Sequence, residues 1–246
     1  MQAVILAAGI GGRLKPLTED LPKCLLKIGD TNILQITIDN LIDNGIEEFI
    51  MVTGYREELI KNYIAYNFTK LKVRYVTNED YAKTNSAYGL CLAKDLIRDE
   101  DIYLLDADIL FESDVIRKLN NSHLENPAAV NITSDLNNEM VKVACDMDNR
   151  ITKIGKNIDL AGAIGEATGI YRLSSYYMQN LFGILSKDME NPANRNEPHE
   201  VYLQKMADTN EKRNSQHAID VSDCICIEID TEEDYEQAKK LWNEKK

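Results

Sequence analysis

Near the start of the chain, a cluster of glycines is followed by two basic side chains that stay charged at neutral pH. An apolar run at 4–6 leads into this cluster, and Arg13 and Lys23 stand shortly after it. The glycines are Gly9, Gly11 and Gly12. Glycine lets backbone N–H groups approach an anion closely, because no Cβ intervenes and positive φ is allowed. Arg13 and Lys23 add fixed positive charge where a polyphosphate would lie, so the segment predicts a nucleotide site.

The spacing does not fit the two commoner glycine-rich sites. A dinucleotide-binding fingerprint needs a third glycine where Leu14 stands, and an acid at the end of the next strand, where the chain has Thr53 and Gly54. A P-loop needs Gly-Lys-Ser/Thr after the bend, and the sequence has no such triplet. From spacing alone, an ordinary strand–turn–helix corner of an α/β domain remains the alternative.

Two predicted strands end in aspartates that could bind a metal ion. The strand at 101–106 ends at Asp106, and Asp108 follows two positions later, so side-chain alternation predicts that both face the same way. Ligands bind beyond the carboxyl ends of strands in open α/β sheets, and paired carboxylates suit a hard divalent cation. A second apolar strand, at 224–229, is followed by Asp230. The alternatives are a solvated strand end for the first pair and helix capping for Asp230 or Thr231.

Short apolar runs alternate with amphipathic stretches along the chain, a pattern typical of βαβ units. We predict strands at 2–6, 48–53, 72–77, 101–106, 128–132, 141–146, 169–173 and 224–229. We predict helices at 33–44, 56–66, 86–96, 112–120, 175–186, 201–206 and 232–243, and polar loops at 187–198 and 210–215. The sequence therefore predicts an α/β fold with a Rossmann-like, mostly parallel but mixed sheet flanked by helices, and a small lid.

Length and charge limit the classes of function. The chain has 246 residues, enough for one large domain with a sizeable core. Its formal net charge of −13 argues against nucleic acid or an anionic membrane as a partner. No apolar run approaches the ~20 residues that span a bilayer, and no basic leader precedes the first strand, so we expect a cytoplasmic protein. The five cysteines show no C-x-x-C spacing and predict neither disulfides nor a zinc site.

The glycine segment resembles the signature loop of the sugar-nucleotidyltransferase superfamily. The residues that would contact the nucleotide there are Leu6, Ala7, Ala8, Gly9, Gly11, Gly12, Arg13 and Lys23. In that superfamily the loop wraps the triphosphate of an NTP, and a mid-chain aspartate shares Mg²⁺ with a late one. The late segment 229–234 is similar to the family's second metal segment. The resemblance thus implies a Mg²⁺ site at Asp108 and Asp230, catalytic roles for Lys23, Arg13 and Asp108, and a supporting nucleotide-binding role for Asp106.

A second segment, 78–93, resembles the branch that uses CTP, which includes phosphocholine and 2-aminoethylphosphonate cytidylyltransferases. In that branch the segment lies against the pyrimidine and the ribose. The residues implied to contact the nucleotide are Asn78, Thr84, Asn85 and Ser86. Gly89 departs from the pattern, because the branch has serine there. A loop that caps the following helix is the alternative for 84–86, and both interpretations can hold together.

The acceptor is expected to bind in a segment at roughly 133–220, inserted within the single domain of residues 1–246. By resemblance, Lys156 is the candidate for the acceptor's phosphate or phosphonate, and Glu166 for its hydroxyl or ammonium group. Plain solvated charges are the alternative for both. A quaternary ammonium favours an aromatic cage. Because 141–169 holds no aromatic residue, the sequence favours a primary amine such as 2-aminoethylphosphonate over phosphocholine.

The implied activity is that of a Mg²⁺-dependent cytidylyltransferase. CTP and a small anionic acceptor would be its partners, and pyrophosphate would be released as CMP is joined to the acceptor. An ionised phosphate or phosphonate needs no general base, which agrees with a chain of three histidines in no triad-like context. A sugar-1-phosphate nucleotidyltransferase is the alternative among enzymes. A non-catalytic, nucleotide-binding regulatory protein is the alternative of another class.

Overall fold

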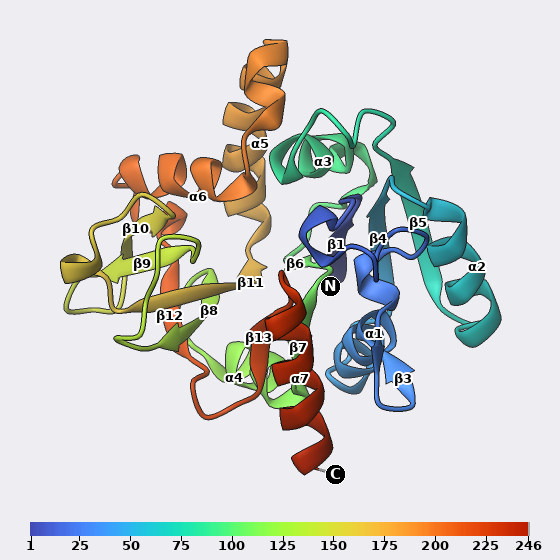
Figure 1. The fold of residues 1–246 in the computed structure, drawn as a ribbon. Coiled ribbons are helices and arrows are strands. Elements are labelled where there is room, and N and C mark those ends of the chain that lie inside the picture. Colours follow the sequence, from blue (N-terminus) through green and yellow to red (C-terminus); the bar gives the residue numbers. More distant parts are fainter. Residues whose placement is uncertain (246) are drawn as a thin grey trace.

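A mixed β-sheet runs through the centre of the computed structural model, which describes residues 1–245 (Figure 1). Its strands are β1 (Gln2–Ala7), β4 (Glu48–Thr53), β5 (Lys72–Thr77), β6 (Ile102–Asp106), β8 (Pro127–Ile132), β9 (Lys142–Cys145), β10 (Ile151–Gly155), β11 (Gly165–Leu173) and β12 (His217–Asp220). They lie in the order β10-β9-β11-β6-β1-β4-β5, with β8 beside β11 and β12 beside β8. Strands β6, β1, β4 and β5 are parallel, whereas β11 runs antiparallel to β6.

Helices cover both faces of this sheet. The α-helices of the described chain are α1 (Ile33–Asp43), α2 (Glu57–Asn67), α3 (Ser86–Leu92), α4 (Ser113–Asn121), α5 (Ser175–Met189), α6 (His199–Asp208) and α7 (Glu232–Glu244). Apolar residues of α1, α2 and α4 share one core with Ala3 and Ile5 of β1. Those of α3, α5 and α6 share the other core with Val4. Successive residues of β1 therefore face opposite helical layers, as expected for parallel strands buried on both sides.

Two short sheets and several 3-10 helices complete the fold. Two short sheets pair β2 (Lys27–Ile28) with β3 (Thr31–Asn32), and β7 (Ile109–Phe111) with β13 (Cys226–Glu228). Short 3-10 helices are η1 (Gly12–Leu14), η2 (Lys23–Leu25), η3 (Lys94–Leu96), η4 (Leu160–Gly162), η5 (Pro192–Asn196) and η6 (Lys212–Asn214). A third core joins α7 to β2 and β7, and it includes the buried residues Leu14 and Ile229.

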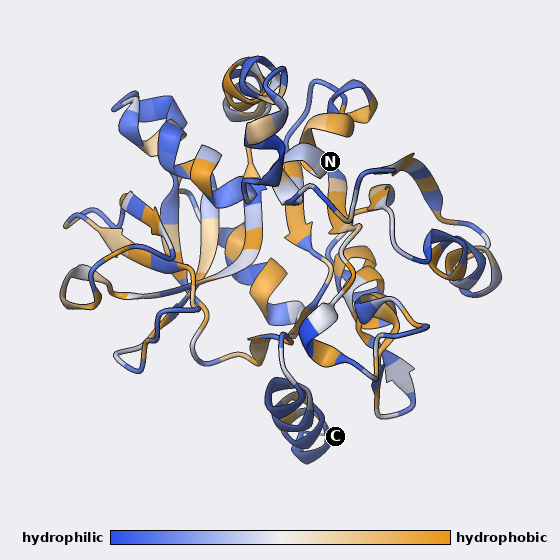
Figure 2. Cartoon of the chain, turned by 45° about the horizontal axis from the view of Figure 1, so that its top comes forward, coloured by the Kyte–Doolittle hydropathy of each residue, from blue (hydrophilic) through white to orange (hydrophobic). Residues whose placement is uncertain are grey.

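The segment 133–220 shares the core of the N-terminal half. Val143 of β9 and Tyr171 of β11 lie in the same buried cluster as Val4 of β1. Figure 2 shows apolar residues concentrated along the central strands, while the helix at the C-terminus is mainly hydrophilic. Within residues 1–245, none of the helices combines the length and the apolar character needed to cross a membrane.

The predicted α/β class and mixed sheet are confirmed, and β4 and β5 have the predicted bounds. Several local predictions were wrong. The polar stretch 187–198 is not all loop, because α5 continues to Met189 and η5 follows it. The helix predicted at 86–96 ends at Leu92 and is followed by η3. The strands β2, β3, β7, β10 and β12 carry no apolar run long enough to predict them. Of these, β7 and β12 form through partners distant in sequence, whereas β2 pairs with β3 and β10 with the preceding β9.

Candidate active site

The glycine loop after β1 is fixed by one conformational requirement and one side-chain hydrogen bond. Gly11 has a φ of +65°, and a Cβ there would lie 3.3 Å from Cγ2 of Thr18. The Thr18 hydroxyl donates to the Gly11 carbonyl at 2.7 Å, which holds the turn in place. An added Cβ would meet nothing within 4 Å at Gly9 or Gly12, so these positions face open space. Of these three loop glycines, Gly11 is therefore the one that needs glycine for its backbone conformation.

Lys23 lies between the two predicted metal ligands. Its Nζ donates to Oδ2 of Asp108 at 2.7 Å and to Oδ1 of Asp230 at 2.6 Å. Arg13 donates to the other carboxylate oxygen of Asp230. Residues more than 200 positions apart thus form one charged cluster at the mouth of the glycine loop. The structure brings together the motifs that the sequence predicted to meet there.

The pairing of β7 with β13 places the two aspartates side by side. Ile109 of β7 is in register with Glu228 of β13, and the backbone N–H of Ile229 donates to the Asp108 carbonyl at 3.0 Å. The cap of α7 is Thr231, whose hydroxyl accepts from the backbone N–H of Asp234. Asp230 is therefore not the helix cap, and its carboxylate is free to face Lys23.

Charge and burial shift the pKa values of this cluster in opposite directions. Burial alone would lower the pKa of Lys23, but the carboxylates of Asp108 and Asp230 raise it above its ordinary value. Burial would raise the pKa of Asp230, but Lys23 and then Arg13 lower it. At Glu228, burial and charge act in the same direction. Partial removal from water, and then the carboxylates of Asp108, Asp230 and Asp106, raise its pKa to about 9, although the side chain keeps contact with solvent.

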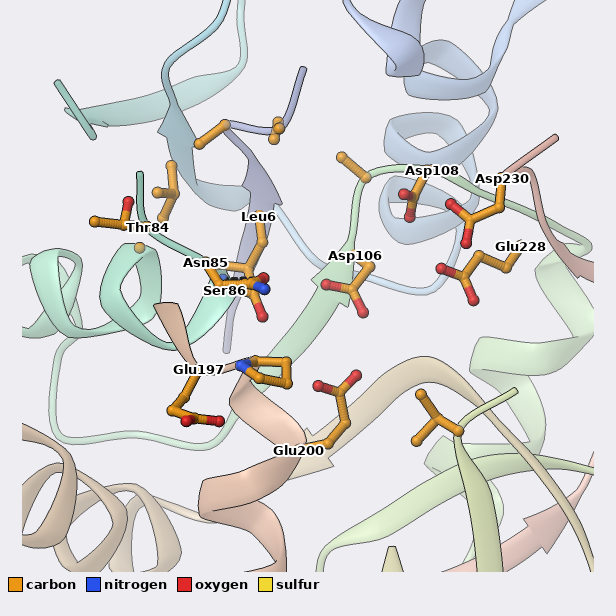
Figure 3. Close-up of a pocket in the computed structure, with 18 of the residues that line it drawn as sticks. Leu6, Thr84, Asn85, Ser86, Asp106, Asp108, Glu197, Glu200, Glu228 and Asp230 are labelled. Atoms are coloured by element: carbon orange, nitrogen blue, oxygen red, sulfur yellow. Dashed lines mark hydrogen bonds between the residues drawn. The ribbon is translucent and has the colours of Figure 1, made fainter. Parts of the chain in front are cut away.

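Asp106 belongs to a different cluster from Asp108. Strand β6 ends at Asp106, so the alternation of side chains expected for the pair does not continue to Asp108. The Asp106 carboxylate lies 3.9 Å from Nδ1 of His199, and Glu200 lies 3.6 Å from the same nitrogen. Burial, and then the charges of Glu200 and Asp108, raise the pKa of Asp106 well above its ordinary value. Figure 3 shows Asp106 between Glu200 and the Asp108–Glu228–Asp230 group.

Neutral hydrogen-bonding groups gather at the opposite end of the same cleft. Nδ2 of Asn78 donates to Oγ1 of Thr84 at 2.9 Å, and the Asn85 side chain accepts from the Ser86 backbone N–H at 2.8 Å. In Figure 3, Thr84, Asn85 and Ser86 lie near Leu6, away from Asp108 and Asp230. Asn85 thus caps α3, as one interpretation of the sequence held, while it also lines the cleft.

The cleft that joins these groups has a volume of about 1260 Å³. The predicted site residues that line it are Leu6, Ala7, Ala8, Gly9, Gly11, Gly12, Arg13, Lys23, Asn78, Thr84, Asn85, Ser86, Asp106, Asp108, Lys156 and Asp230. Lys156 follows β10 and lies 4.0 Å from Glu139, which also lies 3.6 Å from Arg13. A cleft of this volume can hold two small substrates at once.

Glu166 is the predicted site residue that does not line the cleft. It lies on β11, in register with Asn131 of β8 and Lys142 of β9, so neighbouring strands flank it on both sides. Burial, and then the carboxylates of Asp234 and Asp230, raise its pKa to about 7, and Lys156 opposes that shift. The expected contact between Glu166 and an acceptor stays a prediction.

The donor set at Asp108, Glu228 and Asp230 fits a hard divalent cation. One carboxylate oxygen from each lies within 4.8 Å of the others. Oδ1 of Asp108 is buried and has no hydrogen-bond partner among the described residues, although buried polar atoms are normally paired. All three ligands are carboxylates, which suits Mg²⁺ better than a softer metal.

Comparison with known proteins agrees with this arrangement. Residues 2–140, which carry the glycine loop and both mid-chain aspartates, match the profile of the family described as Nucleotidyl transferase. The chain belongs to the nucleotidyl transferase family. The resemblance inferred from the sequence is thereby confirmed at the level of the family, which typically uses a divalent metal ion.

Three curated relatives of the family are similar to parts of the chain. The CTP:phosphoglutamine cytidylyltransferase of Campylobacter jejuni is 36% identical over 131 residues, 51% of this chain and 50% of that protein. The CMP-5'-(3-aminopropyl)phosphonate synthase of Streptomyces rubellomurinus is 33% identical over 119 residues, 48% of this chain and 19% of that protein. The UTP–glucose-1-phosphate uridylyltransferase AglF of Haloferax volcanii is 36% identical over 121 residues, 48% of this chain and 49% of that protein. These matches span about half or less of the relatives' lengths.

A solved structure of the family shares the whole fold. The inositol-1-phosphate CTP transferase from T. maritima superposes with a TM-score of 0.81 at 24% sequence identity, covering 98% of this chain and 94% of that chain. The likeness therefore extends beyond residue 140 to the segment 133–220, where the sequence motifs are weaker. It concerns the fold alone.

Sequence reasoning missed two parts of the site. The first is Glu228, which stands two residues before Asp230. Because side chains two positions apart on a strand face the same way, that spacing is the signal that could have indicated it. His199 was set aside because no catalytic triad surrounds it, yet it is buried and lies beside Asp106. Ser86 of α3 and Asp106 of β6, which lie beside its ring together with the neighbouring Glu200, are distant in sequence, so no spacing within 199–208 could indicate them.

Proposed function

We propose that the chain is a cytidylyltransferase, which joins CMP from CTP to a small acceptor carrying a phosphate or phosphonate and releases pyrophosphate. One observation carries this proposal: a single cleft places the Gly9–Gly12 loop, Arg13 and Lys23 beside a carboxylate trio at one end and neutral groups at the other. Two of the family relatives described above are named for cytidylyl chemistry, which supports CTP as the nucleotide.

The charged end of the cleft suits the triphosphate. The Gly9–Gly12 amides and Arg13 would hold the β- and γ-phosphates, and Lys23 would neutralise charge at the α-phosphate, where one anion must attack another. Asp108, Asp230 and Glu228 would hold Mg²⁺, which supplies further charge neutralisation at the phosphoryl oxygens. The overall charge of −13 opposes anion binding, so these few local cations decide whether the substrate binds.

The acceptor side of the cleft suits a short molecule with an anion at one end and an amine at the other. Lys156 and Lys205 line this side together with Glu197 and Glu200. Among the described residues that line the cleft, Tyr81 is the one aromatic. An aromatic cage for a quaternary ammonium is therefore not formed, whereas two carboxylates can bind a primary ammonium. We propose an aminoalkyl phosphonate or phosphate as the acceptor, in preference to phosphocholine.

An ionised acceptor oxygen is already a nucleophile, so this reaction asks the protein for positioning and charge neutralisation. A sugar-1-phosphate nucleotidyltransferase is the second candidate, because the Haloferax volcanii relative is named for a sugar phosphate. A nucleotide-binding regulatory protein is a third, of a different class.

A panel of pyrophosphate-release assays separates these candidates. The purified chain is incubated with Mg²⁺, one of four NTPs, and one of three acceptors: 2-aminoethylphosphonate, phosphocholine or glucose 1-phosphate. The proposal predicts release with CTP and the aminoalkyl acceptor. Release with glucose 1-phosphate alone would select the sugar-1-phosphate alternative, and NTP binding without release in any combination would select the regulatory one.

A further inference from the structure

Ser86 and His199 form a two-point contact at the end of the cleft away from Asp108 and Asp230. Ser86 is the first residue of α3 and lines the cleft, and His199 is the first residue of α6. Oγ of Ser86 accepts a hydrogen bond from the backbone N–H of His199 at 2.9 Å. The same Oγ lies 3.0 Å from Nδ1 of the His199 ring, whose side chain is only 2% exposed.

The surroundings of the ring determine which nitrogen carries the proton. Nδ1 faces the hydroxyl of Ser86 and two carboxylates, Asp106 at 3.9 Å and Glu200 at 3.6 Å. Nε2 is buried and has no hydrogen-bond partner among the described residues. A proton on Nε2 would leave a buried donor unpaired and a lone pair facing two negative charges. We therefore assign the proton to Nδ1, which makes the ring a donor to Ser86.

This assignment determines what the Ser86 hydroxyl can offer a ligand. A hydroxyl oxygen has two lone pairs and one proton. One lone pair accepts from the His199 backbone and the other from Nδ1–H, so both are occupied. The hydroxyl can then interact with a ligand in the cleft only by donating its own proton. If Nδ1 carried no proton, the hydroxyl would donate to the ring and present a lone pair to the cleft instead.

The position of Ser86 indicates which part of a nucleotide would meet this donor. Ser86 lies with Asn85 and Thr84 near Leu6, whereas Asp108 and Asp230, which pair with Lys23, lie at the other end of the cleft (Figure 3). The carboxylates of Glu200 and Asp106 face the His199 ring beside Ser86. The amide, hydroxyl and apolar groups at 84–86 and Leu6 suit an uncharged heterocycle, whereas Lys23 and Arg13 suit phosphates. This step rests on the proposed function, in which the ligand is an NTP.

We propose that His199 is a positioning residue that makes Ser86 an obligate hydrogen-bond donor to the base, and that this sets a preference for cytosine over uracil. Cytosine has a lone pair at N3, where uracil has an N–H. A hydroxyl that can only donate forms a hydrogen bond with N3 of cytosine, whereas it places its proton against the N3–H of uracil. His199 does not touch the base, and it acts by holding both lone pairs of the hydroxyl.

The test compares dissociation constants for CTP and UTP by calorimetry, with Mg²⁺ and without acceptor, in the wild type and three variants. His199→Leu removes the ring donor and frees Ser86 to accept from uracil. UTP should then bind roughly 3- to 10-fold more tightly, while CTP affinity stays within about twofold. His199→Asn can place its side-chain N–H where Nδ1–H lies and should keep the wild-type ratio. Ser86→Ala removes the hydroxyl without touching the ring and should weaken CTP binding by a similar factor.

The outcomes separate this inference from the proposed function. A wild type that binds CTP no more tightly than UTP would overturn the proposed use of CTP, and the inference with it. A wild type that prefers CTP, with the same ratio in His199→Leu, would overturn the inference alone. If His199→Leu weakens the binding of CTP and UTP equally, the volume of the ring matters and not its N–H, and the inference fails. Identical CTP and UTP affinities in the Leu and Asn variants would have the same meaning. If His199→Leu does not fold, an unchanged ratio in Ser86→Ala overturns the inference.

Discussion

Lys23→Met should destabilise the metal-free protein more than any single change to an exposed ion pair. Methionine keeps the length of the apolar stem and removes the ammonium group that donates to Asp108 at 2.7 Å and to Asp230 at 2.6 Å. The Lys23 side chain is 11% exposed, and each aspartate is 25% exposed. Without the ammonium group of Lys23, the carboxyl groups of Asp108, Glu228 and Asp230 would face one another with oxygens within 4.8 Å.

The size of this effect follows from the burial of the pair. Removing one partner of a fully buried ion pair costs about 3–5 kcal/mol, because the other charge is left buried. The aspartates retain some contact with solvent, so we expect about 2–3 kcal/mol. For a domain of this size that corresponds to a fall of roughly 5–10 °C in Tm. The raised pKa of Lys23 and the lowered pKa of Asp230 mean that both are charged from acidic to mildly alkaline pH. The full effect should therefore appear at pH 7.5.

Thermal melts in EDTA and in millimolar Mg²⁺ or Mn²⁺ measure this prediction. A divalent cation would replace the missing positive charge, so the metal should raise the Tm of Lys23→Met by more than that of the wild type. Lys205→Met is the matched control, because Lys205 also lines the cleft but pairs with Asp188 while 41% exposed. It should lose less than about 1 kcal/mol. Equal melting of wild type and Lys23→Met in EDTA would refute the reasoning, and so would an equal fall in the control.

Three further changes test other parts of the site. Asp108→Ala should lower turnover by about 10²-fold or more, as pyrophosphate release will measure, with a Tm near that of wild type; lost stability with activity retained in the folded fraction would make Asp108 structural. Glu166→Gln should stabilise the protein at pH 8, by at most about 3 kcal/mol in urea unfolding, and hardly at pH 4. The reason is that the folded state raises the Glu166 pKa from 4.5 to about 7, so wild-type stability falls as pH rises through that window; equal effects at both pH values would contradict it. Gly169→Ala should cost about 2 kcal/mol or more in the same assay, because its φ is +70° and the new Cβ would lie 2.6 Å from Oδ2 of Asp106. Gly162→Ala, where a Cβ meets nothing within 4 Å, is the control, and equal losses in both would count against the steric explanation.

Much of the fold and site could be predicted, because local pattern and motif spacing carry that information. The run at 48–53 is mostly apolar and the run at 72–77 alternates polar and apolar residues, and β4 and β5 have the predicted ends. Arg13, Lys23, Asp108 and Asp230 are recognisable by residue type and neighbours, and the structure brings them together.

The remaining features depend on strand pairing and register that no local pattern specifies. Strand β10 exists through its pairing with β9, and β12 through its pairing with β8, so neither shows a strong period of its own. Asp106 and Asp108 fall into separate clusters because β6 ends between them, a boundary that the sequence does not mark. Glu166 lies outside the cleft lining because of the register of β11 with β8 and β9, which hydrophobicity cannot specify.

Strand β11 has a consequence for how substrates enter. It pairs with β6, whose last residue Asp106 lines the cleft, and with β8 and β9 on the side of the cleft where Lys156 lies, so one hydrogen-bonded frame joins the two sides. A jaw-like closure would have to break that frame. We therefore expect substrate capture to proceed through small side-chain and loop adjustments, with a radius of gyration in solution that barely changes between the empty and the nucleotide-loaded protein.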